Sequence, residues 1–153
     1  MKISAGLMLF RNTSSGLEFF LVHPGGPFFA KKDEGWWTIP KGELLENEEP
    51  LAAALREFEE ETGFKPSGKF IELNPIIQKG GKKVLCWAVA FDVDASKFVS
   101  NTFEIEWPPR SGKTKTFPEV DKANWFFYDE AAKLINERQV DFLNQIKTIV
   151  SKS

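Results

Sequence analysis

A short acidic segment carries the residue types and spacing that could do chemistry. Glu57, Glu60 and Glu61 follow directly after Arg56 in one run of the chain. On an α-helix, residues three and four positions apart share a face, so these carboxylates would crowd a patch about one turn long. Such like charges repel one another, and a cation or an arginine must offset the repulsion. Carboxylate oxygens without a nearby His or Cys suit Mg²⁺, with Mn²⁺ as a substitute, rather than zinc.

The segment around these carboxylates is predicted to be a helix. Pro50 suits a first helical position, and Gly63 suits the left-handed residue that follows a last turn. A narrow arc of the helical wheel, separate from the carboxylates, is expected to pack on a sheet and consists of Leu51, Leu55, Phe58 and Thr62, with Ala54 at its edge. The acidic run could instead be only a solvated helix face, which is a common use of glutamate.

Apolar runs separated by turn residues predict the remaining elements. Strands are expected at residues 3–10, 17–22, 36–39, 70–78, 83–93 and 123–128, and a helix from residue 129 onward. The first two strands would form a hairpin across the polar turn 11–16, whereas residues 101–115 are expected to be irregular. This order predicts an α/β protein with a mixed β-sheet between helices, in a single domain over residues 1–150.

Composition limits the possible partners. The chain has 153 residues and a formal net charge of -2, which gives no electrostatic case for a nucleic-acid polymer. Its single cysteine, Cys86, lies among apolar residues and favours a reduced, cytoplasmic setting. No stretch approaches the roughly 20 apolar residues that a membrane span needs. We therefore expect a soluble cytoplasmic protein without a membrane partner, either a monomer or a homodimer.

The acidic run belongs to a longer pattern. Gly42 is followed after five residues by Glu48, and after seven more by the run from Arg56 to Phe64. At every fixed position and both spacings, this pattern resembles the signature of the Nudix (MutT-like) hydrolases. A chance match over so many positions is improbable, so the resemblance weighs strongly against a merely solvated helix face.

The resemblance implies a Nudix-type α/β/α sandwich with a mixed β-sheet and Mg²⁺-dependent hydrolysis of a nucleoside diphosphate linked to another group. It implies that catalytic and metal-binding groups are Glu57, Glu60, Glu61, Glu119 and the backbone carbonyl of Lys41. Arg56 and Glu48 would form an ion pair that orients the carboxylates. Gly42 would let the loop pass close to the metal and phosphate, and Gly63 would provide the positive φ needed at the helix end. Either Glu57 or Glu119 could accept the proton from the attacking water.

The substrate is less closely defined. Pro40-Lys41-Gly42 and residues 117–121 resemble the branch that contains diadenosine tetraphosphate hydrolases and related nucleoside triphosphate pyrophosphohydrolases. Aromatic and cationic side chains that could bind a base and a polyphosphate are Lys41, Phe28, Trp107, Arg110 and Lys113. Trp107 could equally be a packing anchor, and His23 is expected to be structural.

Several other functions remain open. The same chemistry could remove oxidised nucleotides of the 8-oxo-dGTP type or cleave a nucleotide sugar. A different class is a non-catalytic nucleotide sensor, which an intact signature does not favour. RNA decapping would need a surface for the polymer, and the slightly acidic composition does not suggest one.

Overall fold

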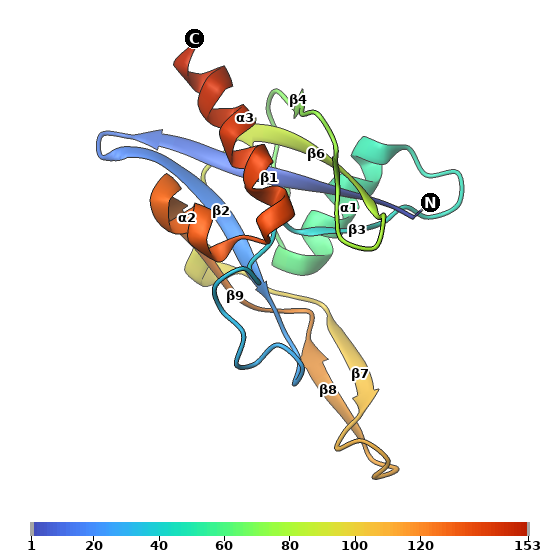
Figure 1. Ribbon diagram of the computed structural model, residues 1–153. Helices are drawn as coiled ribbons and strands as arrows, with labels where there is room; N and C mark the ends of the chain where they lie inside the picture. The colour runs from blue at the N-terminus through green and yellow to red at the C-terminus, as the bar shows by residue number, and fades with distance from the viewer. Residues whose placement is uncertain (1, 153) are drawn as a thin grey trace.

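Side chains alternate between the two faces of β1 (Ile3–Thr13), and this alternation divides the apolar core into two layers. Leu7 and Leu9 belong to the layer under α1 (Pro50–Thr62). Met8 and Phe10 belong to the layer under α2 (Tyr128–Leu134) and α3 (Val140–Ser151). The computed structural model, which describes residues 2–152, thus has the predicted α/β/α layers, with helices on both faces of one sheet (Figure 1).

The sheet is mixed, as predicted. Its main order is β4-β6-β1-β2-β9, in which β1 pairs parallel with β6 and antiparallel with β2, and β2 pairs antiparallel with β9. The bounds of these strands are Gly16–Pro24 for β2, Ile71–Glu72 for β4, Lys83–Ala90 for β6 and Val120–Phe127 for β9. Two short strands, β3 (Lys41–Glu43) and β5 (Ile76–Ile77), pair with β1 and β6.

Helix α1 begins and ends where its local sequence predicts. Pro50 opens it, and Gly63 follows it with a left-handed φ of 80°. The buried face is shifted from the predicted arc: Phe58 and Thr62 are buried with Ala53 and Ala54, whereas Leu51 and Leu55 are only partly buried. The shift places small alanines where the helix approaches the sheet.

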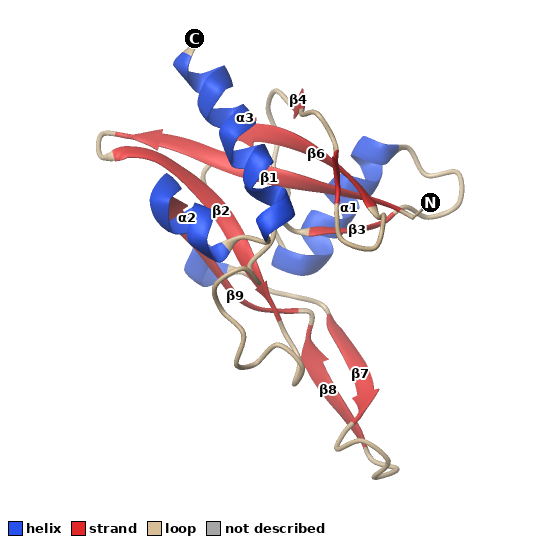
Figure 2. Cartoon of the chain, viewed as in Figure 1, coloured by secondary structure: helices blue, strands red, loops and turns tan. Residues whose placement is uncertain are grey.

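Two predicted segments are wrong in their secondary structure. Residues 101–115 are not irregular, because β7 (Thr102–Glu106) and β8 (Thr114–Pro118) form an antiparallel hairpin that projects from the body (Figure 2). The predicted strand 70–78 is instead the two short strands β4 and β5. Pro75 lies between them, and a proline has no N–H to donate to a ladder.

Two further segments are less regular than predicted. Residues 36–39 make only isolated bridges, Val22 to Thr38 and Trp37 to Ile135. The predicted C-terminal helix is interrupted between α2 and α3 by a 3₁₀ turn, Glu137–Gln139, in which the Asn136 side chain accepts a hydrogen bond from the Arg138 N–H. Cys86, which lies among apolar residues in the sequence, is buried. Among residues 2–152, no helix combines the length and apolar character needed to cross a membrane.

Gln139 joins these irregular segments inside the core. Its side chain is 1% exposed, accepts a hydrogen bond from the Ile39 N–H (3.0 Å), and donates to Gln78 (2.8 Å) and Thr38 (3.0 Å). Residues 38 and 39 have few ladder bonds, so this side chain replaces a strand neighbour. It thereby holds the segment that leads into β3.

We predict that Gln139→Ala lowers the free energy of unfolding by about 2 kcal/mol, because the buried Ile39 N–H loses its acceptor. Urea unfolding at neutral pH measures the change. Gln145→Ala is the control, since Gln145 bonds the backbone of Asn74 at the surface, and we expect it to cost well under half as much. Equal losses in the two variants would contradict a special role for Gln139.

Candidate active site

Arg56 organises the acidic face of α1. Its guanidinium donates two hydrogen bonds to the carboxylate of Glu48 (2.8 and 2.9 Å). A third nitrogen lies 2.8 Å from Glu57 Oε1 and 3.2 Å from Glu60 Oε2. The hydrogen bonds from Arg56 are the main reason that the pKa of Glu48 falls to about 2. One arginine therefore ties the preceding loop to two of the helix carboxylates.

Gly42 lies against the carboxylate of Glu57. A Cβ at position 42 would overlap this carboxylate in its present position, so a larger residue there would displace it. The strand residue before it, Lys41, donates a backbone hydrogen bond to Glu61. Strand β3 and α1 thus approach each other closely enough for the backbone to hold the carboxylates directly.

A pocket of about 320 Å³ brings together groups that are distant in the sequence. Its wall includes Lys41 from β3, Glu57 and Glu61 from α1, and Glu119 from the bend before β9. The remaining lining residues are mostly apolar and are Val22, Pro24, Thr38, Ile39 and Val120. We call this cavity the acidic pocket. Apolar walls around several ionisable groups are typical of a reactive site.

Crowding and burial shift the protonation of these groups. Burial, followed by the charges of Glu57 and Glu119, raises the pKa of Glu61 to about 9. The pKa values of Glu57 and Glu119 are also raised, in both cases first by burial and then by neighbouring carboxylates. Burial lowers the pKa of Lys41, and the nearby Lys82 adds to this shift. The pocket thus disfavours the ionised forms of its own carboxyl groups.

The donor set fits a hard divalent cation. The oxygens of Glu57, Glu61 and Glu119 face one pocket, and their mutual repulsion would be relieved by a cation such as Mg²⁺. Within residues 2–152, no three acidic, His or Cys side chains already stand at ligand distances from one another. Arg56 pairs with Glu57 and Glu60. Glu60 does not line the pocket.

The family model described as the NUDIX domain matches residues 2–146. The chain belongs to the Nudix family. A 96-residue stretch is 32% identical to the asymmetrical bis(5'-nucleosyl)-tetraphosphatase of Rattus norvegicus and covers 55% of this chain and 61% of that protein. A 27-residue stretch is 70% identical to the mRNA-decapping protein g5R of African swine fever virus, over 18% of this chain and 11% of that protein. The matches therefore span less than two thirds of either relative.

Solved structures share the Nudix fold. An Ap4A hydrolase of C. elegans, solved as a binary complex, superposes with a TM-score of 0.71 at 18% identity, over 98% of this chain and 99% of that one. The NUDIX domain of Shewanella oneidensis NrtR, complexed with ADP ribose, gives a TM-score of 0.66 at 16% identity, over 97% and 87% of the two chains. At such identities the likeness establishes the architecture.

Four of the five aromatic and cationic candidates, all except Lys41, lie outside the acidic pocket of this Nudix domain. Phe28 and Trp107 contact each other edge to face, with ring centroids 5.6 Å apart, so the loop after β2 meets the β7–β8 hairpin. Phe28 is 57% exposed. Arg110 and Lys113 lie in the turn between β7 and β8, where Arg110 has a left-handed φ of 62° and its N–H is accepted by Glu106. Lys41 is the one substrate-binding candidate that lines the pocket.

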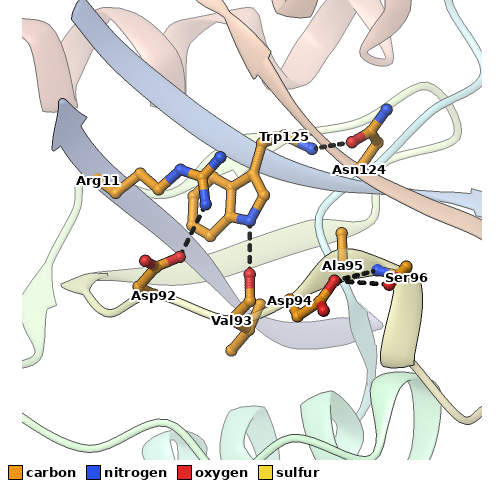
Figure 3. A pocket seen from close by; sticks show the side chains of 8 residues that line it. All are labelled: Arg11, Asp92, Val93, Asp94, Ala95, Ser96, Asn124 and Trp125. Carbon is orange, nitrogen blue, oxygen red and sulfur yellow. Dashed lines mark hydrogen bonds and ion pairs between the residues drawn. The ribbon is translucent and has the colours of Figure 1, made fainter. Parts of the chain in front are cut away.

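A second cavity, of about 600 Å³, lies beside the α1 layer at the far ends of β1 and β9 (Figure 3). The Arg11 guanidinium covers the Trp125 ring at 4.2 Å and donates to Asp92 at 2.8 Å. Asp94 accepts two hydrogen bonds from Ser96. The polar groups that line this second cavity thus pair with one another, whereas the carboxylates of the acidic pocket crowd together. The acidic pocket is the smaller of the two cavities.

Several walls of the acidic pocket come from residues that the sequence did not mark as part of a site. Pro24 and Val22 come from the end of β2, and Val120 from the start of β9. These are ordinary apolar residues, and nothing in their types or spacing marks them as part of a site. Thr38 and Ile39 precede the signature, and only their position before Lys41 could have suggested a place in the pocket.

We predict that the metal-free protein loses stability as the pH rises from about 5 to about 9. The folded-state pKa of Glu61 is raised from 4.5 to about 9, so between these values the folded state binds more protons than the unfolded state. Stability therefore falls with increasing pH across this window, and the loss is complete above it. The raised pKa values of Glu57 and Glu119 act in the same direction.

Urea unfolding in the presence of a chelator, at several pH values, measures this slope. Glu61→Gln should flatten it. Glu59→Gln removes a carboxylate from the same helix at an exposed position paired with Lys65, and it should keep the wild-type slope. A wild-type slope in Glu61→Gln would show that another group is responsible.

Proposed function

We propose that this protein is a Nudix hydrolase that cleaves a diphosphate linkage in a nucleotide, with Mg²⁺ as cofactor and Mn²⁺ as a substitute. The observation that carries the proposal is the set of three carboxylates and one lysine in the acidic pocket. The raised pKa values of Glu57, Glu61 and Glu119 indicate that a cation would stabilise their ionised forms. Relatives of the matched family and the signature spacing agree with this reaction.

The residues would divide the work as follows. Glu57, Glu60, Glu61 and Glu119, together with the Lys41 carbonyl, would hold Mg²⁺, which supplies charge neutralisation of phosphate oxygens and a lowered pKa of water when it is bound. For Glu60 this requires its carboxylate to turn from Arg56 toward the pocket. The ammonium of Lys41 would bind a phosphate oxygen, and the Arg56–Glu48 pair would keep the helix carboxylates in place.

Glu119 is the better candidate to accept the proton from the attacking water. Its pKa is raised, which brings a carboxylate closer to the range in which it is an effective base at neutral pH. Glu57 has a raised pKa too, but its Oε1 atom lies 2.8 Å from the Arg56 guanidinium. An arginine at this distance weakens a carboxylate as a base because it stabilises the charged form.

The proposed substrate is a dinucleoside polyphosphate of the diadenosine tetraphosphate kind, or a nucleoside triphosphate. The rat relative is named for this reaction, and the local sequence around Lys41 resembles that branch. Phe28 and Trp107 would contact the base, and Arg110 and Lys113 would contact an extended phosphate chain. The hairpin brings these groups to one side of the molecule, next to the loop after β2.

We predict that Glu61→Gln and Glu60→Gln each lower kcat by more than about a hundred-fold, because each removes a charge that the metal needs. Glu59→Gln makes the same chemical change in the same helix and should keep near wild-type kcat. Steady-state assays with Mg²⁺ measure these values, and circular dichroism checks the fold. Full activity in Glu60→Gln would remove Glu60 from the site.

A substrate screen decides among the alternatives. Purified protein with Mg²⁺ is offered diadenosine tetraphosphate, ATP, 8-oxo-dGTP, ADP-ribose, a nucleotide sugar and capped RNA, and products are read by mass spectrometry in oxygen-18 water. Preferred turnover of the tetraphosphate or ATP supports the proposal. If another compound is turned over preferentially, that compound becomes the assigned substrate in place of the tetraphosphate or ATP. If compounds bind but none is turned over, the protein is a nucleotide sensor.

We predict that Trp107→Ala and Phe28→Ala raise KM for the preferred nucleotide about ten-fold with kcat within about two-fold, since stacking on a base contributes about 1–3 kcal/mol. Phe127→Ala is the matched control. Phe127 is also an exposed aromatic residue (47%), but it lies at the C-terminal end of β9, whereas the start of β9 lines the acidic pocket. Binding of a non-hydrolysable ATP analogue, measured by calorimetry, provides a second readout. Unchanged binding in both variants would exclude the aromatic pair from the substrate site.

A further inference from the structure

His23 is fully buried at the end of β2 and makes two polar contacts. Its Nδ1 atom lies 2.7 Å from Oδ1 of Asp121 in β9. Its Nε2 atom lies 2.6 Å from the carbonyl oxygen of Lys32, in the loop that follows β2. The ring also meets the edge of Trp37, with centroids 5.5 Å apart. One side chain therefore joins β2, β9 and the loop.

Both ring nitrogens are engaged in hydrogen bonds. A carbonyl oxygen can only accept a hydrogen bond, so Nε2 donates to the carbonyl of Lys32. Nδ1 shares the second hydrogen bond with the Asp121 carboxyl group. A buried group that is satisfied on both sides holds its partners in defined positions.

The contact with Asp121 secures a bulge in the sheet. Pro24 pairs with Val120, but the adjacent His23 pairs with Lys122, which leaves Asp121 as an extra residue on β9. Counting alternately back from Trp125, which packs in the α1 layer, Asp121 would point into that layer. The bulge instead turns Val120 into the α1 layer and Asp121 toward His23. Bulges next to active sites commonly redirect side chains in this way.

The bulge lies beside the acidic pocket. Glu119 and Val120 line that pocket from β9, and Pro24, which follows His23, lines it from β2. The backbone of Glu119 is held on both sides, since its carbonyl accepts from Gly25 N–H (2.9 Å) and its N–H donates to the Asn101 carbonyl (2.8 Å). A Cβ on Gly25 would overlap the carbonyl of Pro118, so the two segments are already in close contact.

We propose that His23 is a positioning residue whose contacts with Asp121 and the Lys32 carbonyl hold the β9 bulge and the loop after β2 so that Glu119 and Pro24 stay in the acidic pocket. This role deepens the proposed function and rests on it. His23 does not contact substrate or metal in this scheme. It acts through the backbone of the segments on either side of it.

The kinetic test uses His23→Gln, Asp121→Asn and the double variant. In His23→Gln, the glutamine has one amide donor group, which cannot reach both Asp121 and the Lys32 carbonyl. In Asp121→Asn, the asparagine keeps the shape of the aspartate but lacks its carboxyl group. Each single variant should lower kcat about ten-fold, with KM within about two-fold, and the double variant should be no worse than the singles. Additive losses, or a change confined to KM, would overturn the proposal.

A stability control separates positioning from general destabilisation. Ile146→Val removes a methylene from a fully buried residue of α3, in the core layer under α2 and α3. It lowers stability without touching the bulge, so kcat should stay at the wild-type value. If Ile146→Val and His23→Gln lose kcat equally at matched losses of stability, the effect of His23 on kcat comes from stability alone, and His23 has no positioning role.

Two readouts do not depend on turnover. The chain has a single histidine, so ¹⁵N labelling of histidine reports His23 alone, and we expect Asp121→Asn to shift the Nδ1 signal more than the Nε2 signal. Amide hydrogen exchange at Gly25 and Glu119 should accelerate at least ten-fold in His23→Gln and not in Ile146→Val. An Nδ1 signal that Asp121→Asn leaves unchanged, or unchanged amide exchange, would overturn the proposal.

These readouts also keep the proposal distinct from the proposed function. If the wild-type protein hydrolyses no nucleotide in the screen, the proposed function fails and the kinetic arm has no signal. The Nδ1 signal of His23 and the amide exchange rates then decide alone whether His23 holds the bulge at Glu119.

Discussion

Repulsion among partly buried carboxylates is the constraint on which the rest of the site depends. Glu57, Glu61 and Glu119 share one pocket, and each has a raised pKa because its charge is poorly solvated and close to other negative charges. A protein keeps such a group together only if other interactions compensate for the cost. In this chain Arg56 and backbone contacts offset the cost, and a tightly packed glycine leaves room for one of the carboxylates.

Those compensating contacts explain much of the local architecture. Arg56 holds Glu57 and Glu60 while its paired hydrogen bonds to Glu48 fix the loop before the helix. Gly42 lets β3 approach the Glu57 carboxylate, and the Lys41 N–H supports Glu61. The loop, strand and helix of the signature therefore form one unit. The strand supplies a hydrogen-bond donor and the space that glycine leaves, and the helix supplies the negatively charged carboxylates.

The opposite wall of the pocket is built by a different part of the chain. The end of β2, the bulge in β9 and the root of the β7–β8 hairpin meet at Glu119 through backbone hydrogen bonds and the His23–Asp121 pair. The same region carries the contact between Phe28 and Trp107. Groups proposed for catalysis and for base recognition thus share one support, so a shift in this region would alter both.

The sequence by itself determined the features that depend on short-range interactions. The limits of α1 follow from Pro50 and Gly63, and the spacing of Arg56 and its glutamates follows from helical periodicity, so both were predictable. Only the tertiary structure decided which distant residues meet: Glu119 with Glu61, Phe28 with Trp107, and His23 with Asp121, 98 positions away. It also made residues 102–118 a hairpin and broke strand 70–78. The physical reason is that strand pairing, bulges and buried ion pairs depend on partners far along the chain, whereas helix caps and helical spacing depend on neighbours within a few residues.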